Sequence, residues 1–298
     1  MKHADKIACC FFPTTVPFVD DEKEFLQRTA FTTQVDNAYS VFQLRPEEAL
    51  KTVNVEHSPI DPATEVYNDQ RHQRVSVVVV DYQMPDLNGL QFCAQIGKRS
   101  VRRILVSAEL PIEKAVVAIN KGDLHGYIEK KKGDPFQQIT DLMRQLPMEF
   151  FCEETGTFAQ AGAKAQSALD ERKFVQHFSQ LQQELHIAEY YMLNPAGTFL
   201  LLGKNKEGYG LCVRSRAQLQ ELAKQAQAKG APKYITMGLA NAECLLCLPD
   251  PANQTLTESV AWDRCVYPIS HYFVGRRGAY YMTCQPGMLD LTFSRIRS

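Results

Sequence analysis

The stretch Val75-Ser76-Val77-Val78-Val79-Val80-Asp81 decides the fold of the first half of this 298-residue chain. Its valines do not alternate with polar residues, and such a β-branched run is typical of a strand buried on both faces, as in a parallel sheet. Outward from it, further strands are predicted at residues 16–19, 38–42, 103–106 and 127–128. Helices are predicted between them and after the last, at residues 22–31, 46–53, 90–96, 111–122 and 136–146.

Five strands that alternate with five helices predict a doubly wound, flavodoxin-like α/β fold with a five-stranded parallel sheet. We expect this domain to cover residues 1–148. Pro17 falls inside the first strand, where a proline removes a backbone donor, so we expect it at the strand start or at a local irregularity.

Polar side chains stand where these strands end. Asp20 and Asp21 follow the first strand, Asp81 ends the valine-rich strand, Ser107 ends the fourth strand and Lys130 follows the fifth. The carboxyl ends of the strands in a doubly wound sheet open into one crevice, so we expect these side chains to gather there.

The chemistry of such a cluster can be argued from its residue types. Three carboxylates a few ångströms apart repel one another and need a cation, and oxygen ligands without His or Cys favour Mg²⁺. Asp81 is the predicted nucleophile toward a phosphoryl group. Lys130 would place a positive charge on the phosphoryl oxygens, and Ser107 would donate a hydrogen bond to them.

The segment Asp81-Tyr82-Gln83-Met84-Pro85-Asp86-Leu87-Asn88-Gly89 resembles the phospho-acceptor loop of bacterial receiver domains. Similar resemblances are carried by residues 18–22, 105–109 and 126–130, in the same order as in that family. The resemblance covers residues 14–146. It implies a two-component response regulator that is phosphorylated on Asp81, with Mg²⁺ held by Asp21, Asp81 and the backbone carbonyl of Gln83, beside Asp20. It also implies that Tyr127 rotates inward as Ser107 moves toward the phosphate.

Two departures from the receiver pattern stand out. Lys131 occupies a position where the family usually has proline, and the segment between the second helix and the valine-rich strand is longer than usual. Similar insertions occur in receivers with unusual output domains, some of which resemble quorum-sensing regulators.

The second half, residues 149–298, has the pattern of an α+β output domain that begins with a long helix at 161–185. Strands are predicted at 190–193, 198–202, 211–213, 234–237, 244–248 and 280–284. Asn194-Pro195-Ala196-Gly197 is a turn signal, and Ser215 is a predicted N-cap of a helix that ends near Gly230. The sequence shows no helix-turn-helix with a basic recognition helix.

Composition narrows the function classes. The chain is 45% hydrophobic and 22% charged with a net charge of -1, which is typical of a soluble globular protein and points neither to nucleic acid nor to a membrane surface. The apolar run at 7–19 is broken by two prolines, and nine scattered Cys fit a reducing cytoplasm.

Three functions remain open at this point. The first is a phosphorylation-switched regulator that acts through dimerisation or domain contacts, with a sensor histidine kinase or phosphotransfer protein as its partner. The second is an atypical nucleic-acid-binding regulator. The third is an output enzyme, although no catalytic constellation stands out beyond phosphotransfer to the receiver aspartate itself.

Overall fold

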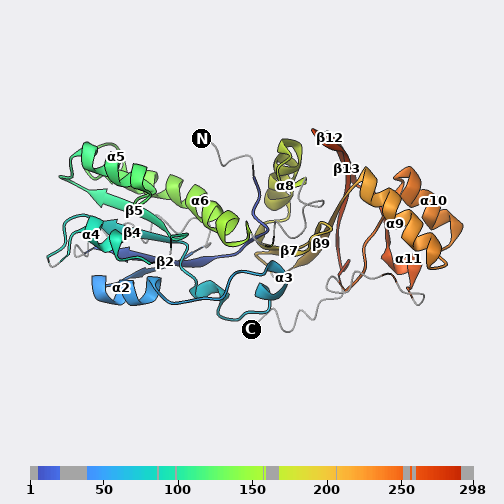
Figure 1. Cartoon of the computed structure of the whole chain (residues 1–298), viewed down its shortest axis with the longest axis horizontal. Helices are drawn as coiled ribbons and strands as arrows, with labels where there is room; N and C mark the ends of the chain where they lie inside the picture. Colours follow the sequence, from blue (N-terminus) through green and yellow to red (C-terminus); the bar gives the residue numbers. More distant parts are fainter. Residues whose placement is uncertain are drawn as a thin grey trace. The chain divides into compact units, whose positions relative to one another are not determined.

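The computed structural model describes residues 6–20, 39–85, 87–97, 99–156, 158, 168–205, 207–250, 256 and 260–289; the side chains of 39–43 are not described. The predicted helix at 22–31 and the predicted metal ligand Asp21 lie outside these residues. The chain forms two compact units (Figure 1). The parallel-sheet unit comprises Phe12–Pro59 and Gln70–Glu154, and the antiparallel-sheet unit comprises Met1–Phe11, Ile60–Asp69 and Thr155–Ser298.

The parallel-sheet unit contains the five-stranded sheet that the sequence predicts. All four neighbouring pairs are parallel, which confirms the flavodoxin-like fold. The strand order is β3 (Tyr39–Gln43), β2 (Thr14–Val19), β4 (Val77–Asp81), β5 (Arg102–Ser107) and β6 (Gly126–Glu129). All five residues of the valine-rich β4 are buried, as expected for a central strand.

Three helices lie between these strands as predicted, namely α2 (Pro46–Val53), α4 (Gly89–Ala94) and α5 (Ile112–Lys121), and α6 (Pro135–Glu154) follows the last strand. The short η1 (Arg71–Gln73) precedes β4. Helix α5 ends at Gly122, whose φ of 78° is a left-handed conformation that glycine adopts without a steric cost.

Helix α6 is longer than predicted, because it continues through Pro147 to Glu154. A proline inside a helix removes one hydrogen bond, which normally ends or kinks the helix. Here Phe150 and Phe151 lie beyond the proline and are fully buried, and Phe151 packs edge-on against Phe12 at 4.7 Å between ring centroids. Burial of these rings offsets the lost bond.

Pro17 lies in the interior of β2 and is accompanied by an irregularity in the pairing with β4. The sheet pairs Thr15 with Val75 and then Phe18 with Val79, so the β4 side has one residue more than the β2 side between these points. The missing donor of Pro17 therefore falls where the ladder is interrupted.

Residues 1–11 and 60–69 belong to the antiparallel-sheet unit, although they precede or interrupt the parallel-sheet unit in the sequence. The sequence instead predicts one boundary between the domains, at residue 148. Strand β1 (Cys10–Phe11) pairs with β7 (Ile187–Asn194) in antiparallel register. The longer-than-usual insertion contributes α3 (Pro62–Glu65), which packs against β7. The first segment is held in the antiparallel-sheet unit by backbone pairing with β7. The second is held there by the burial of Ile60 and Val66.

The antiparallel-sheet unit is built on one six-stranded sheet in the order β1, β7, β8 (Thr198–Gly203), β9 (Gly208–Ser215), β13 (Gly278–Pro286) and β12 (His271–Gly275). A two-stranded sheet joins β10 (Cys244–Leu246) to β11 (Val266–Pro268). Besides α3, its described helices are α8 (Arg172–Glu184), α9 (Arg216–Ala228), α10 (Lys233–Asn241) and α11 (Trp262–Cys265). The predicted N-cap Ser215 is confirmed, because its side chain accepts from Gln218 N in a reciprocal capping box.

Two secondary-structure predictions in this unit are wrong. Residues 161–185 do not form one helix, because α8 begins only at Arg172 after Glu171, whose backbone is extended and whose buried carboxylate accepts from the amide of Arg276. The predicted strand at 234–237 is helical: α10 buries Ile235 and Leu239, four residues apart, against Leu219 of α9. The two helices lie side by side in Figure 1.

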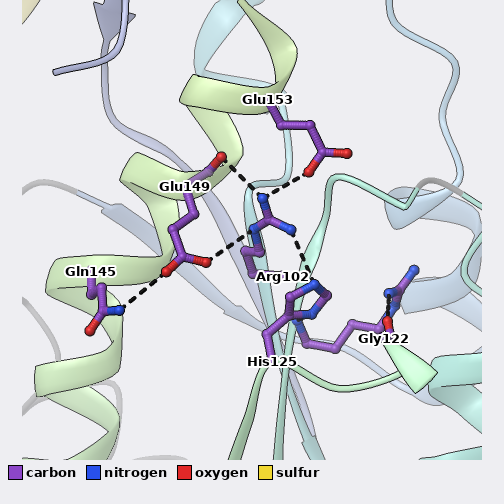
Figure 2. A network of polar contacts seen from close by, with 7 residues as sticks. Arg102, Gly122, His125, Gln145, Glu149 and Glu153 are labelled. Atoms are coloured by element: carbon purple, nitrogen blue, oxygen red, sulfur yellow. Dashed lines mark hydrogen bonds and ion pairs between the residues drawn. The ribbon is translucent and has the colours of Figure 1, made fainter. Parts of the chain in front are cut away.

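A polar network fastens the end of α6 to the amino-terminal end of β5 (Figure 2). The Arg102 side chain donates from Nη2 to the Glu149 carbonyl at 3.0 Å and to the Glu153 carboxylate at 2.8 Å. Its Nη1 lies 3.1 Å from Nε2 of His125, and the amide of Arg103 donates to Nδ1 of the same ring at 3.1 Å. Because Nδ1 accepts this hydrogen bond, the second proton that would make the ring an imidazolium ion is disfavoured. Burial, together with the charges of Arg102 and Arg103, lowers the pKa of His125 to about 4.

We expect His125 to make stability pH-dependent on the acid side. The unfolded chain takes up a proton near the ordinary pKa of 6.5, whereas the folded ring does so only near 4, so stability present at pH 7 is lost as the pH falls through this window. For a partly exposed ring we expect a loss of about 1 kcal/mol between pH 7 and 5.

Urea unfolding at the two pH values, for wild type and His125→Leu, measures this contribution. The variant should lose less stability than wild type on acidification, and an NMR titration should place the ring near pKa 4. Equal acid sensitivity of the two proteins would contradict the assignment.

Candidate functional site at the carboxyl edge of the parallel sheet

Three of the predicted site residues meet at the carboxyl edge of the sheet. Asp20 directly follows β2, Asp81 ends β4 and Lys130 directly follows β6. The Nζ atom of Lys130 lies 3.0 Å from Oδ1 of Asp81 and 3.4 Å from Oδ2 of Asp20. The parallel register of the strands brings together side chains that are up to 110 positions apart in the chain.

The site is desolvated. The side chains of Asp20 and Asp81 are 4% and 5% exposed, and that of Lys130 is 16% exposed. The described cluster combines two carboxylates and one ammonium in a place with little water, where electrostatic interactions are stronger than at the surface. The described part of the cluster is therefore suited to a further cation or to a group with which Lys130 can pair.

The loop after β4 is held against Asp81. The backbone amide of Gln83 donates to Oδ2 of Asp81 at 2.9 Å, and the Gln83 side chain donates to the Glu109 carboxylate at 2.9 Å. Gly89 starts α4 so close to the strand that a Cβ there would lie 2.4 Å from the Asp81 carbonyl oxygen. Only glycine allows this approach, which fixes the course of the loop from Asp81 to α4.

Ser107 and Tyr127 meet at one loop residue that the sequence did not single out, Leu110. The Ser107 hydroxyl oxygen is fully buried and accepts from the amides of Glu109 at 3.1 Å and Leu110 at 2.8 Å. The Tyr127 hydroxyl donates to the Leu110 carbonyl at 2.9 Å. Both side chains therefore hold the loop after β5. Burial, with a smaller contribution from Glu129, raises the pKa of the Tyr127 phenol.

The structure thus places the predicted residues in two groups. Asp20, Asp81 and Lys130 are in direct contact, with Gln83 bonded to Asp81, while Ser107 is bonded to the adjacent loop. Among the described residues, which exclude Asp21, no three or more His, Cys, Asp or Glu side chains are arranged to hold a metal ion.

Comparison with known families agrees with this geometry. Residues 16–141 match the response regulator receiver domain. This part of the chain is a receiver domain. The match includes the whole cluster of Asp20, Asp81 and Lys130 together with Ser107 and Tyr127, and the chain has the organisation of a two-component response regulator, a receiver with an atypical output domain.

Among solved structures, the response regulator LqsR of Legionella pneumophila is similar over both units. It is 29% identical, with a TM-score of 0.82 over 97% of this chain and 92% of LqsR. A CheY-like receiver domain protein from Methanospirillum hungatei (17% identity, 46% of this chain and 95% of that one, TM-score 0.35) and a Francisella response regulator receiver domain (19%, 45% and 96%, TM-score 0.34) also match.

The search of curated proteins found no match. None of the described helices is both long and apolar enough to cross a bilayer.

Ser107→Ala tests the role of the buried hydroxyl in holding the loop. The substitution leaves the buried amide of Leu110 without its acceptor, which should lower the free energy of unfolding by about 1–3 kcal/mol. Ser107→Thr, which keeps a hydroxyl at this position, is the matched control and should lose clearly less. Urea unfolding measures both, and equal losses would show that the hydroxyl does not support the loop.

Proposed function

We propose that this protein is a response regulator in which Asp81 accepts a phosphoryl group from a phosphorylated histidine of a sensor kinase or phosphotransfer protein. The observation that carries the proposal is the contact of Lys130 Nζ with both Asp81 and Asp20 at the carboxyl edge of a receiver sheet. The protein would work in the cytoplasm, where such partners present their phosphohistidine.

The transfer step is a displacement at phosphorus. A carboxylate oxygen of Asp81 forms a bond to phosphorus while the bond from phosphorus to the histidine nitrogen breaks, and the imidazole leaves with the electron pair. The product is an acyl phosphate on Asp81. Lys130, already 3.0 Å from Asp81, is positioned to pair with the new phosphoryl oxygens.

The residues fit a Mg²⁺ ion at this site. Its ligands would be the carboxylates of Asp20, Asp21 and Asp81 and the backbone carbonyl of Gln83, an all-oxygen set of the kind that Mg²⁺ prefers. Two of these carboxylates, those of Asp20 and Asp81, are buried and lie within 3.4 Å of the Lys130 ammonium. When bound, the ion would supply charge neutralisation between the attacking carboxylate and the phosphoryl oxygens.

Ser107 and Tyr127 would form the switch. The Ser107 hydroxyl, which accepts from the amides of Glu109 and Leu110, still has its own proton to donate to a phosphoryl oxygen. A movement of Ser107 toward the phosphate would displace the loop that Tyr127 also binds. The loop and Tyr127 would then rearrange together. Phosphorylation shifts this equilibrium only by the difference between its interactions with the two states.

The output is proposed to be a change in dimerisation or in contacts of the antiparallel-sheet unit. The alternative of a nucleic-acid-binding output gains little from α10, the second helix of a consecutive pair, because Lys233 is its single basic residue. An output enzyme and a role in quorum sensing remain predictions from the sequence.

Phosphorylation with acetyl phosphate and Mg²⁺ tests the proposal. Wild type should gain one phosphoryl group that is stable to acid and labile to base, as detected by mass spectrometry of the intact protein. Asp81→Asn should gain none, because an amide is not a nucleophile for this transfer. Lys130→Met should be labelled far more slowly, since the charge beside the phosphoryl oxygens is lost.

Asp141→Asn is the matched control, because Asp141 is an exposed carboxylate on α6. It should be labelled like wild type. Labelling that persists in Asp81→Asn would refute the assignment of the phosphorylation site. Light scattering of the phosphorylated and unphosphorylated proteins then shows whether the switch changes the dimerisation state.

A further inference from the structure

The antiparallel-sheet unit contains a cavity that the proposed phosphorylation does not use. Its volume is about 240 Å³, and it lies beside the first turns of α9, next to the end of β9 and the turn between β7 and β8. One side of the cavity is apolar and the other is polar. The apolar lining consists of Leu222, Leu246, Leu248 and Leu256.

The polar side of the cavity is formed around a buried cation, Arg214. This residue is only 2% exposed. Its Nη1 atom donates to the carbonyls of Ala196 at 2.8 Å and Val213 at 2.9 Å, and its Nη2 atom donates to the Thr198 hydroxyl at 2.9 Å. All three acceptors are neutral, so they hold the guanidinium in place without balancing its charge.

Within the part of the chain that the structure describes, Arg214 has no carboxylate counter-ion. No described acidic side chain forms an ion pair with it, and its Nε is buried without a hydrogen-bond partner. A buried charge that lacks a counter-charge is destabilising, and arginine retains its proton in proteins. An anion in the adjoining cavity would supply the missing charge.

The surroundings of Arg214 limit the charge of that anion. Ser215 caps α9 directly after Arg214, so the positive end of the helix dipole lies beside the same cavity. Glu221 lies on the lining nearly two turns further along α9, where it is exposed and accepts from Gln225 at 3.1 Å. A second negative charge on the ligand would face Glu221, which favours a single negative charge.

We propose that this cavity is a binding site for a small monoanionic ligand with an apolar body, a monocarboxylic acid of modest size. The acid group lies toward Arg214 and the apolar body lies against the leucines. The antiparallel-sheet unit would thus have an effector-binding site of its own, separate from Asp81.

The single tryptophan of the chain makes the site measurable. Trp262 packs against the apolar cluster that includes Leu246, Leu248 and Leu256, so its fluorescence reports on the cavity. Titration of the full-length protein uses hexanoate, hexan-1-ol and adipate as probes. Hexanoate should bind saturably and about tenfold or more tightly than the uncharged alcohol, as expected for an ionic hydrogen bond in a desolvated site. Adipate, with its second charge, should bind more weakly than hexanoate.

Three variants separate this site from surface binding. Arg214→Met should abolish the preference for hexanoate over hexan-1-ol. Because Arg214 is buried and its variant could unfold, Glu221→Gln provides an independent test at an exposed position and should reduce the preference for hexanoate over adipate. Arg277→Met, which removes an exposed arginine outside the lining, should bind like wild type.

The proposal is overturned if hexanoate gives no saturable signal or if hexanoate and hexan-1-ol bind equally. It is also overturned if Glu221→Gln leaves the ratio of the hexanoate and adipate affinities unchanged. Because the readout does not involve phosphorylation, these outcomes are independent of Asp81.

Discussion

The parallel-sheet unit depends on one electrostatic constraint: two carboxylates that are nearly excluded from water share the ammonium of Lys130. Removing the ammonium would leave both buried carboxylates without this ion pair, which is destabilising. The sheet provides this proximity. Asp20, Asp81 and Lys130 belong to three different strand ends, and the parallel register alone brings them to one edge.

The same edge also explains how a charge change at Asp81 can reach further into the fold. Gln83 links Asp81 to Glu109, and the loop that contains Glu109 and Leu110 is held by Ser107 and Tyr127. At the opposite end of β5, Arg102 ties the strand to the last turns of α6, the helix that leads to the antiparallel-sheet unit. Strand β5 therefore carries the Ser107 hydroxyl at one end and the attachment of α6 at the other.

The sequence predicts the parallel sheet well because the responsible signals are local: the valine run, the capping and turn residues, and polar residues at strand ends. Predictions failed where distant contacts decide the outcome. Helix α6 passes Pro147 because Phe150 and Phe151 are buried, and α10 is a helix because Ile235 and Leu239 pack on α9. The role of Leu110 in the loop after β5 could not be predicted from the sequence, because it acts through its backbone amide and carbonyl. In the sequence Arg214 resembles any surface arginine, and only the structure shows that it is buried, with no carboxylate partner among the residues described.

The central claim is that Asp20, Asp81 and Lys130 form one phosphoryl site. A crystal structure of the full-length protein with Mg²⁺ and beryllofluoride, a mimic of the phosphoryl group, tests it most directly. The account predicts beryllium bonded to a carboxylate oxygen of Asp81, a fluoride in contact with Lys130 Nζ, and the metal on the acidic residues that follow β2. Beryllofluoride on another carboxylate, or Lys130 turned away from the bound fluoride, would contradict it.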